Sequence, residues 1–537
     1  MQIKTVLQIK GGLKMKKHFF VLLMITITLV SFSFLLLADN NDDWLHARGN
    51  KIYDKYGNEV WLTGANWFGF NCSENVFHGA WYDIKTILTD IADRGIGLLR
   101  IPISTELLYS WMIGNPNPVS SVTAVPGSEY EKPVNPDFYD PETDGSKNSM
   151  EIFEIIIGYC KELGIKVMID VHSPDANNSG HMYPLWYGVE TATAGVITTE
   201  MWIDTLVWLA DKYKNDDTIL AIDLKNEPHG ERGFSGPIPP DMAIWDNSKA
   251  PNNWKHAAEE CAKAILAVNP NLLIVIEGVQ QYPNTAAGYT YEDPDVWGKS
   301  GIYFNAWWGG NLRGVRDYPI DLGSLNSQIV YSPHDYGPSV YNQPWFDKDF
   351  TRETLLEDYW YDTWAYIYEE GIAPLLIGEW GGHMDGGKNQ KWMEILRDYI
   401  VENRIHHTFW CINPNSGDTG GLLGNDWTTW DEEKYALLKK ALWQDEQGRF
   451  VGLDHKIPLG KNGITITEYY GGIVEPPVRK GDLNGDELIN SLDYILLRRL
   501  LLDFAVEIVE GSADLNGDGS VNSLDYVLLR RIILGNH

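Results

Sequence analysis

The stretch MEIFEIIIGYCKELGIKVMIDVH, residues 150–172, indicates the fold class most directly. Its first part, Met150–Leu163, has the apolar spacing of a helix. Its last part, KVMIDVH, is an apolar run typical of a parallel strand that is covered on both faces. Gly164 stands between them, and glycine adopts the left-handed conformation after a helix without a Cβ clash. The stretch therefore predicts a helix that ends at a glycine and leads into a buried strand.

Similar junctions occur at Gly95-Ile96 and Gly371-Ile372, and apolar runs recur along the chain. The predicted strands are WLTGANW (61–67), LLRIPIS (98–104), KVMIDVH (166–172), AIDLKNE (221–227), LLIVIEG (272–278), IVYSPHD (329–335), PLLIGEW (374–380) and HTFWCIN (407–413). Helical patterns lie between most of them, for example at 202–213 and 254–268. Eight strands alternating with helices predict an α/β fold, the (β/α)8 TIM barrel.

The predicted loops differ in length at the two ends of the strands. Turns from helix to strand are short, whereas strand-to-helix loops are long and rich in Pro, Gly, Asn and Trp, for example 105–146, 228–250, 279–320 and 380–390. In this fold these long loops lie on the face at the strand C-termini, where active sites are built. Trp186, Trp307 and Trp308 fall on such loops, where they either stack on a ligand or pack in the core.

Composition limits the possible partners. The 537 residues include 43 Lys and Arg against 74 Asp and Glu, a formal net charge of -31. Such a charge argues against nucleic acid and against an anionic membrane surface, which both need clustered cations. A neutral polymer such as a polysaccharide remains possible, and the 22 Trp and 28 Tyr offer flat faces that stack on sugar rings.

The four cysteines are far apart and form no CxxC pair. They are too few for a disulfide scaffold, and the missing pair argues against zinc. We expect Cys72, Cys160, Cys261 and Cys411 to be buried thiols.

The N-terminal segment resembles a targeting signal. Lys14, Lys16 and Lys17 precede an uncharged stretch of 20 residues, Phe19–Ala38. A basic region followed by an apolar one predicts a signal peptide over residues 1–38 and a secreted, extracellular protein, with translation starting at Met1 or Met15. The alternative is an uncleaved anchor, because 20 residues just span a membrane. After cleavage we expect no stable membrane insertion.

The C-terminal tail is an internal repeat. GDLNGDELINSLDYILLRRLLL begins at Gly481, and ADLNGDGSVNSLDYVLLRRIIL begins 32 residues later at Ala513. A short segment with Pro476-Pro477, which favours an extended linker, precedes the repeats. The predicted organisation is a signal peptide at 1–38, a barrel at 39–470, a linker at 471–480 and a small all-α domain at 481–537.

Each repeat orders oxygen ligands as an EF-hand loop does, with side chains at positions 1, 3, 5, 9 and 12 and a backbone carbonyl at position 7. The predicted ligands are Asp482, Asn484, Asp486, Leu488, Asn490 and Asp493 in the first loop, and Asp514, Asn516, Asp518, Ser520, Asn522 and Asp525 in the second. The usual glycine at position 6 is Gly519 in the second loop and Glu487 in the first, so we expect weaker binding or a distorted turn there. The alternative is a pair of solvated Asx turns.

A helix follows each loop in the prediction. In the first helix Leu492, Ile495, Leu496 and Leu500 form an apolar stripe, and the repeat reproduces it. No clear helix precedes either loop, in contrast to a full EF-hand.

Polar residues lie at or near the C-terminal ends of the barrel strands, so they converge on the mouth. They are Arg100, His172, Asn226, Glu227, His334, Tyr336, Glu379 and Trp410. Glycoside cleavage needs one carboxyl group to protonate the leaving oxygen and a second one to meet the positive charge on the sugar. Glu227 and Glu379 are the candidates. The spacing along the sequence does not decide between retaining and inverting geometry.

Several motifs resemble glycoside hydrolase family 5, and most of all its bacterial endo-β-1,4-glucanase (cellulase) branch. They are RIPIS (100–104), LKNEPH (224–229), VYSPHDYG (330–337) and LLIGEW (375–380). The resemblance implies a retaining (β/α)8 enzyme without a catalytic cofactor. It assigns Glu227 as acid/base and Glu379 as nucleophile. In the same family Arg100 supports the nucleophile, His172 and Asn226 line the catalytic subsite, His334 and Tyr336 orient the carboxylates, and Trp410 is the sugar platform.

The tail resembles the type I dockerin of cellulosomal enzymes on its duplicated loop–helix pattern. That resemblance implies two Ca2+ ions and docking to a cohesin of a scaffold protein. Ser491-Leu492 and Ser523-Leu524 fall where the family sets cohesin choice. The alternative for the tail is a calcium-stabilised domain without a partner.

The expected function is a secreted, scaffold-docked endo-β-1,4-glucanase acting on cellulose. Two alternatives stay open. The same fold and mechanism serve mannan, xylan or mixed-linkage β-glucan, and a barrel can also bind carbohydrate without catalysis, because a fold does not fix a function.

Overall fold

The computed structural model describes residues 43–120, 122, 134–140, 142, 145–231, 242–293, 301–472, 479–485, 488–502, 504–506, 508–509 and 511–534. The predicted signal peptide lies outside these residues. The chain divides into a large unit that ends at Tyr469 and a small unit that comprises Tyr470–His537 together with the short segment Tyr56–Asn58.

The large unit is built on eight parallel strands, which confirms the predicted TIM barrel. In chain order they are β4 (Thr63–Asn66), β5 (Leu98–Ser104), β8 (Lys166–Ser173), β11 (Ile219–Asp223), β12 (Leu273–Glu277), β15 (Ile329–Ser332), β16 (Leu376–Ile377) and β17 (His406–Phe409). Their spatial order, β15-β12-β11-β8-β5-β4-β17-β16, follows the chain around the sheet. A parallel bridge between Tyr331 and Leu375 joins its two edges, so the barrel is nearly closed.

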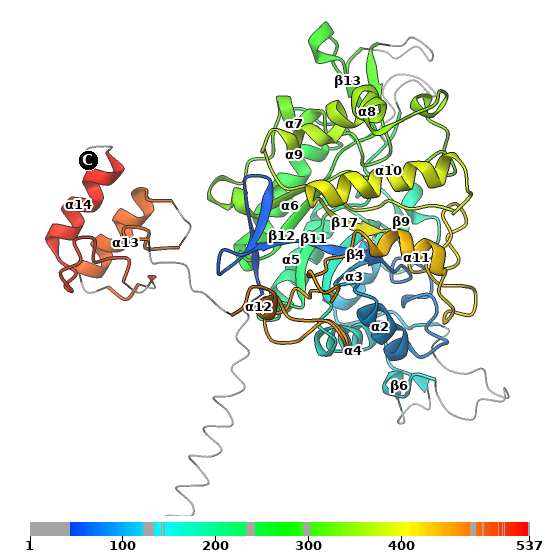
Figure 1. Ribbon diagram of the computed structural model, residues 1–537, viewed down its shortest axis with the longest axis horizontal. Helices are drawn as coiled ribbons and strands as arrows, with labels where there is room; N and C mark the ends of the chain where they lie inside the picture. Colours follow the sequence, from blue (N-terminus) through cyan, green and yellow to red (C-terminus); the bar gives the residue numbers. More distant parts are fainter. Residues whose placement is uncertain are drawn as a thin grey trace, which may run out of the picture. The chain divides into compact units, whose positions relative to one another are not determined.

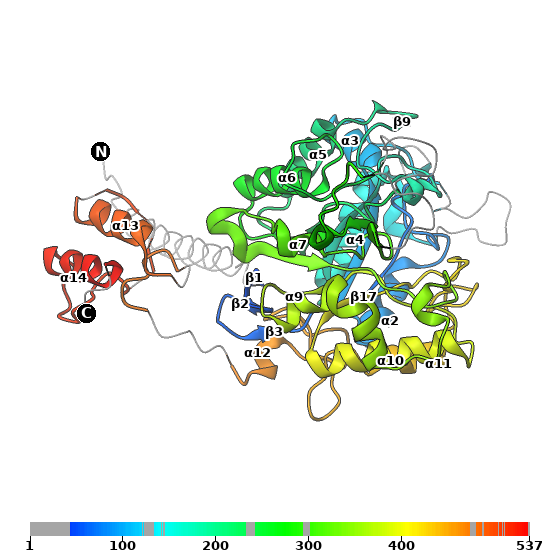
Figure 2. The same ribbon diagram turned by 90° about the horizontal axis from the view of Figure 1, so that it is seen from above.

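Helices surround the strands, as Figure 1 shows. They are α2 (Ile84–Asp93), α3 (Thr105–Met112), α4 (Ser149–Glu162), α5 (Thr199–Lys212), α6 (Trp254–Val268), α7 (Gly314–Asp317), α8 (Arg352–Leu355), α9 (Tyr366–Glu369), α10 (Lys388–Asn403), α11 (Glu432–Lys439) and α12 (Ile466–Tyr469). A π-helical segment, η6 (Leu356–Ala365), connects α8 to α9. In Figure 2, α5 and α6 lie on the opposite side of the strands from α10 and α11.

Short antiparallel strands lie outside the eight-stranded barrel. A three-stranded antiparallel sheet, β1 (Leu45–Arg48), β2 (Lys51–Asp54) and β3 (Glu59–Val60), precedes the first barrel strand. Three two-stranded ribbons lie within the strand-to-helix loops: β6 (Tyr139–Asp140) with β7 (Gly145–Ser146), β9 (Glu190–Thr191) with β10 (Gly195–Val196), and β13 (Gln281–Pro283) with β14 (Tyr303–Asn305).

Helix α4 shows how the sequence specifies a repeating unit. The Asn148 side chain accepts hydrogen bonds from the first turn, and Glu151 returns a bond to the Asn148 backbone, so both orphan donors are satisfied. The helix buries Ile152, Phe153 and Ile156 against the strands. Gly164 then takes a φ of 71°, and a Cβ there would lie 2.7 Å from the Pro458 carbonyl oxygen. The predicted glycine junction is thereby confirmed.

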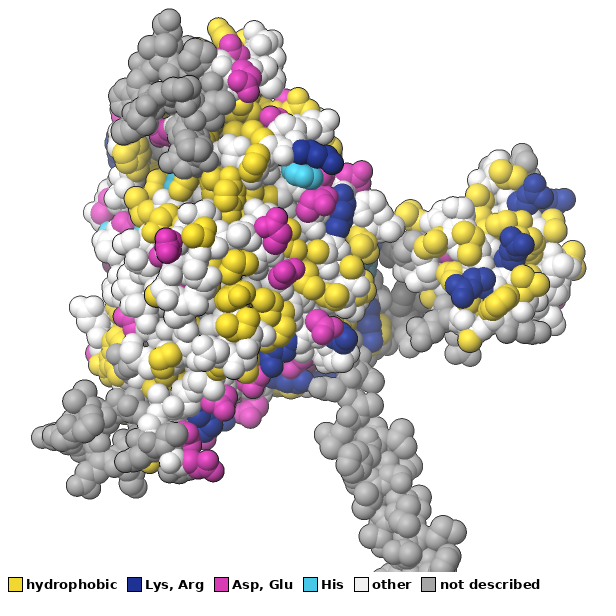
Figure 3. All heavy atoms as spheres, turned by 180° about the vertical axis from the view of Figure 1, so that it is seen from behind, with side chains coloured by type: hydrophobic (Ala, Val, Ile, Leu, Met, Phe, Trp, Pro, Cys, Tyr) yellow, Lys and Arg dark blue, Asp and Glu magenta, His cyan; other side chains and the backbone are white. Residues whose placement is uncertain are grey.

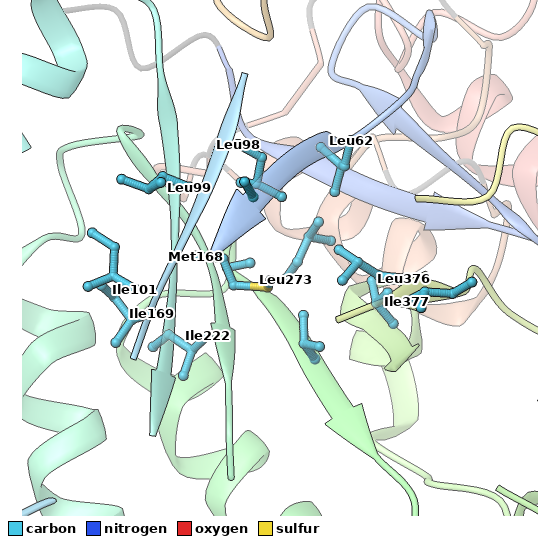
Figure 4. Packing of buried hydrophobic residues seen from close by; sticks show 14 of the residues in the cluster. Leu62, Leu98, Leu99, Ile101, Met168, Ile169, Ile222, Leu273, Leu376 and Ile377 are labelled. Atoms are coloured by element: carbon cyan, nitrogen blue, oxygen red, sulfur yellow. The ribbon is translucent and has the colours of Figure 1, made fainter. Parts of the chain in front are cut away.

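Aliphatic side chains fill the barrel and the layer between strands and helices. Figure 4 shows Leu98, Ile101, Met168, Ile222 and Leu376 among them, on four strands of the barrel. Their exposed fractions are 2% or less. Each such side chain contributes about 1.5–3 kcal/mol of burial free energy, so this layer is the main stabilising element of the unit.

Buried charges close the base of the barrel, at the N-terminal ends of the strands. The Lys166 ammonium, at the start of β8, forms ion pairs with Asp43, with Asp217 at 3.1 Å and with Asp454 at 3.1 Å. The His455 ring contacts Asp43 Oδ1 at 2.6 Å. The cluster therefore joins the first described residue to a segment that follows the last barrel helix.

The small unit consists of two helices of equal length, α13 (Ser491–Leu501) and α14 (Ser523–Ile533), each preceded by a loop. Leu483, Leu497, Ala513 and Leu529 form its core, and the Tyr494 and Tyr526 rings stack with centroids 4.1 Å apart. The predicted apolar stripe is only partly buried, since Leu492 and Ile495 are about half exposed and Leu497 is the core residue instead. Figure 3 shows apolar side chains beside Lys and Arg side chains on one face of this unit.

The four cysteines are free and buried, as expected. Among the described residues, no helix has the length and apolar character that a membrane crossing needs.

Candidate active site

Glu227 and Glu379 meet at the C-terminal end of the barrel. Glu227 follows β11 and Glu379 follows β16, strands that lie far apart in the order of the sheet. One carboxylate oxygen of each, together with a ring nitrogen of His334, lies within 4.8 Å of the other two. A parallel bridge between His334 and Glu379 holds their backbones in register.

Arg100 and Tyr336 hold the Glu379 carboxylate from two sides. Arg100 Nη1 donates to Oε1 at 2.7 Å, and the Tyr336 hydroxyl donates to Oε2 at 2.7 Å. Burial alone would raise the pKa of Glu379, but the positive charges of His334 and Arg100 outweigh burial and hold the pKa at about 2. Glu379 is therefore an ionised carboxylate in the range where proteins work.

Glu227 has the opposite environment. Its φ of 50° lies in the left-handed region, which is sparsely populated for residues with a side chain. Its Oε1 lies 3.0 Å from His334 Nδ1. Burial raises the pKa of Glu227 above its usual value, and the charge of Glu379 acts in the same direction. His334 acts in the opposite direction and lowers this pKa. Two neighbouring carboxyl groups with pKa values moved apart are the pattern of an acid and a nucleophile.

His334 contacts three carboxylates. Its Nε2 lies 3.1 Å from Glu277 Oε1, and its Nδ1 lies 3.7 Å from Glu379 Oε2 in addition to the contact with Glu227. Burial disfavours a charged ring, but the charges of Glu277 and Glu379 raise the pKa of His334 well above its usual value. The ring is thus an imidazolium that links the two catalytic candidates.

Asn226 and His172 lie next to this pair. The Asn226 side-chain oxygen accepts from Arg100 Nη2 at 3.0 Å, which fixes the amide. His172 Nδ1 contacts Asp170 Oδ2 at 2.6 Å, and burial lowers the pKa of His172 well below its usual value. A neutral ring oriented by a carboxylate can offer its other nitrogen atom to a hydroxyl group.

Trp410 follows β17 and is the half-buried aromatic residue of the group. Its ring stacks with His172 at a centroid distance of 5.6 Å and with Phe68 at 5.5 Å, and its Nε1 donates to Ser416 Oγ at 3.1 Å. A fixed indole beside two carboxyl groups provides a flat apolar face for a pyranose ring.

The three loop tryptophans differ in burial: Trp307 is buried, with its ring 6.0 Å from that of Tyr336. Trp186 is fully buried and packs against Trp202 and Trp254, so it belongs to the core. Trp308 is half-buried and stacks on the His229 ring at 3.9 Å.

Three acidic residues of the site do not stand out from the sequence. Asp170, Asp223 and Glu277 end or nearly end their strands and surround the Arg100 guanidinium at 3.2, 2.9 and 3.3 Å. Burial raises the pKa of Asp170 to about 7, of Asp223 to about 6 and of Glu277 to about 8. The available signal was an acidic residue inside each apolar run: Asp170 in KVMIDVH, Asp223 in AIDLKNE, which also contains Glu227, and Glu277 in LLIVIEG.

Potential metal ligands gather in three groups among the described residues. Two of them share His334: one is the catalytic pair with His334, and the other is Asp223 with Glu277 and His334, beside the Arg100 guanidinium. The third is Cys72 with Glu74 and His78, where His78 Nε2 lies 3.1 Å from Glu74 and His78 Nδ1 lies 3.0 Å from Asn415 Nδ2. Protein side chains thus already contact the nitrogen atoms of each group.

The predicted calcium loops of the small unit have the same fold twice. Asp482 Oδ1 accepts from the Gly485 amide at 2.8 Å, and Asp514 Oδ1 accepts from the Gly517 amide at 2.8 Å. Gly485 and Gly517 have φ values of 76° and 75°. Asp486 lies outside the described residues. The side chain at position 1 thus closes the same tight turn in both loops.

The last ligand of each loop also caps the following helix. Asp493 Oδ2 accepts from the Asn490 amide at 2.8 Å, and Asp525 Oδ2 accepts from the Asn522 amide at 2.8 Å. Asp493 and Asp525 are fully buried, so positions 9 and 12 are held together at the helix start. Close carboxylate and amide oxygens are the donor set of Ca2+, and the residues present fit that ion.

The barrel and its paired carboxyl groups define a glycoside hydrolase. The chain belongs to glycosyl hydrolase family 5: the family model described as "Cellulase (glycosyl hydrolase family 5)" matches residues 53–416. The "Dockerin type I domain" matches residues 480–534.

Relatives agree with this assignment. The chain is 73% identical over 485 residues to Endoglucanase G of Acetivibrio thermocellus, a match that covers 86% of each protein. It is 45% identical over 535 residues to Endoglucanase B of the same organism, covering 90% of each. A solved structure of a hyperthermophilic endocellulase from Pyrococcus horikoshii has a TM-score of 0.59 at 34% identity, covering 74% of this chain and 98% of that one.

Proposed function

We propose that the chain is an endo-β-1,4-glucanase that cleaves internal bonds of cellulose with retention of anomeric configuration. The observation that carries the proposal is the pair Glu227 and Glu379, with oxygens within 4.8 Å and pKa values moved in opposite directions. Retaining glycosidases hold their carboxyl groups about 5–5.5 Å apart, whereas inverting ones need roughly 6.5–9.5 Å to admit a water molecule. The names of the relatives support the choice of substrate.

In the first step a Glu379 oxygen attacks the anomeric carbon. The bond from that carbon to the glycosidic oxygen breaks, and the leaving oxygen takes the proton of Glu227. Arg100 and Tyr336 aim the attacking carboxylate through their hydrogen bonds to its two oxygens. The products are a covalent glycosyl ester at Glu379 and a released chain end.

In the second step water replaces the ester. Glu227, now a carboxylate, removes a proton from the water molecule, whose oxygen attacks the same carbon and expels Glu379. Glu227 is thereby protonated again and Glu379 is ionised again. We assign Asn226 and His172 to the hydroxyl groups of the sugar at this site and Trp410 to its apolar face.

Product analysis tests this proposal. NMR of cello-oligosaccharide hydrolysis should show the β-anomer first, and Glu227→Gln should lower the rate by roughly 10²–10⁴-fold. Azide needs no general base, so it should restore turnover in Glu227→Ala and yield a β-glycosyl azide. An α-anomer as first product would exclude retention, and faster hydrolysis of xylan or mannan than of cellulose would change the substrate.

We propose that the small unit binds two Ca2+ ions and docks a cohesin of a scaffold protein. The repeated loop geometry supports the ions, and the half-exposed Leu492 and Leu524 beside the loops support an apolar contact with a partner. Calorimetric titration should show two Ca2+ sites, with Asp514→Ala removing one. Cohesin capture that persists in excess chelator would contradict the proposal.

We further propose that the enzyme is secreted. The basic residues before the apolar stretch Phe19–Ala38 support export. The intact mass of protein from the culture medium should correspond to a chain cleaved close to Ala38, whereas retention of the full mass in a membrane fraction would indicate an anchor.

A further inference from the structure

Glu277 has contacts that neither the core nor the proposed mechanism explains. It is the last residue of β12 and is fully buried. Its Oε2 accepts from the backbone amide of Glu227 at 2.8 Å, and its Oε1 lies 3.1 Å from His334 Nε2 and 3.3 Å from Arg100 Nη2. The Glu277 carboxylate thus contacts the backbone of Glu227. It also contacts His334 and Arg100, which both contact Glu379.

The backbone contact acts where the chain is strained. Glu227 has a φ of 50°, a conformation that costs of order 1–3 kcal/mol and persists only where surrounding contacts determine it. The Glu277 carboxylate satisfies the amide of this residue inside the protein. Gly309 packs against both groups, because a Cβ there would lie 2.0 Å from Glu277 Oε2 and 3.1 Å from Glu227 Cα.

The imidazole contact acts on the side chain of Glu227. His334 Nε2 lies 3.1 Å from Glu277 Oε1, and its Nδ1 lies 3.0 Å from Glu227 Oε1, so the ring stands between the two carboxyl groups. A carboxylate behind an imidazole fixes the ring orientation and its protons. We propose that Glu277 is a positioning residue that sets both the backbone and the side chain of the acid/base Glu227. This inference rests on the proposed function.

The charged groups that face Glu277 come from three strands and their extensions, β5, β11 and β15. Arg100 and His334 carry positive charge near it, Asp223 and Glu227 carry carboxyl groups, and Lys225 lies close enough to interact through its charge. Because His334 lowers the pKa of Glu379 more than any other neighbour does, a loss of charge on His334 raises the pKa of Glu379.

The experiment compares substrates with different leaving groups. Glu277→Gln keeps an oxygen for the Glu227 amide but replaces the carboxyl oxygen that faces His334 Nε2 by an amide NH2 group. We expect kcat/KM on cello-oligosaccharides to fall roughly 10–100-fold, as for supporting residues of other sites, and to fall much less on a dinitrophenyl cellobioside, whose leaving group needs no proton. Equal losses on both substrates would overturn the inference.

A matched control is Glu259→Gln on α6. Glu259 is also buried, accepts from a backbone amide (Asp321) at 2.8 Å and pairs with Lys255 at 2.9 Å, but it is not part of the site. We expect no dependence on the leaving group in this variant. If Glu277→Gln does not fold, Gly309→Ala displaces the same carboxylate by its added methyl group and should give the same substrate pattern.

The proposed function is tested separately with Glu227→Gln. If this variant loses activity equally on both substrates, the acid role of Glu227 fails and the inference about Glu277 falls with it. If Glu227→Gln depends on the leaving group and Glu277→Gln does not, the acid role stands and the inference alone is overturned.

Discussion

At the scale of single residues, two glutamates of identical chemistry receive different proton affinities from their neighbours. Glu379 accepts from Arg100 and Tyr336, which stabilises its charge, whereas the burial of Glu227 favours its protonated form. Catalysis by such a pair operates between the two pKa values, because one group must be ionised while the other holds a proton.

Tyr336→Phe tests the support of Glu379. The lost hydrogen bond at 2.7 Å favoured the ionised carboxylate, so the pKa of Glu379 should rise in the variant. Since Glu379 must be ionised to attack, the acid limb of the kcat/KM profile should move to higher pH, and kcat should fall by about 10-fold or more. The measurement is initial rate against pH on a cello-oligosaccharide. An unchanged acid limb would remove Tyr336 from the site.

At the scale of elements, the base of the barrel depends on a cation placed at the start of β8. Lys166→Met leaves Asp43, Asp217 and Asp454 without their shared partner in a buried place. We expect the free energy of unfolding to fall by about 3–5 kcal/mol, the cost of breaking a buried ion pair from one side. Urea unfolding measures this loss.

The control for Lys166 is Lys85→Met on α2. Lys85 pairs with Glu162 at 2.8 Å on the surface, where both side chains are half exposed or more, so its loss should change the free energy of unfolding by less than about 1 kcal/mol. Both variants should keep the wild-type pH profile of activity. A profile altered by Lys166→Met would mean that the base and the mouth of the barrel are coupled.

The helices and strands are the part of the fold that the sequence predicts best. All eight barrel strands occur where the apolar runs lie, because a strand covered on both faces has few polar positions. The runs extend beyond the strands: PLLIGEW predicts seven residues and β16 contains two, Leu376 and Ile377. The extra residues, Glu379 among them, leave the strand to form the site, and an apolar run does not mark that point.

The site was predicted less completely than the fold. Sequence motifs indicate the eight candidate residues. The ring of Asp170, Asp223 and Glu277 around Arg100 depends instead on contacts between residues that are far apart in the chain. Asp170 and Glu277 are the single acidic residues of their runs, and Asp223 shares its run with Glu227, so each resembles an ordinary polar residue of a strand. Only the closure of the barrel brings them to one guanidinium, so single runs did not indicate their role.

At the scale of the whole molecule, stability should depend on alkaline pH through His455. Burial disfavours its charge, but Asp43 and Asp54 raise the pKa of His455 to about 9, above its usual 6.5. A pKa that is higher in the folded state than in the unfolded state stabilises the fold, and this stabilisation is complete below the unfolded-state pKa. The free energy of unfolding should therefore decrease as pH rises from about 6.5 through 9. Urea unfolding at several pH values should show a steeper decrease for the wild type than for His455→Gln. Equal slopes would contradict this assignment.

Removal of Ca2+ should affect the two units differently. The loops of the small unit bring several carboxylates together, and metal binding is coupled to the folding of such loops. We expect a chelator to lower the Tm of the small unit and leave that of the large unit unchanged in calorimetry of the full chain. Hydrolysis of a soluble cellulose derivative should persist in chelator, and its loss would indicate a metal requirement of the barrel.

The ion cluster at the base of the barrel also indicates where the ends of the polypeptide could be joined and new ends opened. The His455 amide donates to Asp43 Oδ1 at 2.9 Å, and the Ile466 amide at the start of α12 donates to the Asp454 carbonyl at 3.1 Å. The first described residue and the last helix of the large unit therefore adjoin, on the side away from the paired glutamates. Domains whose ends adjoin accept circular permutation. A short peptide bridge could therefore connect these ends, and new termini could be opened in a surface turn, without any rearrangement around the scissile bond.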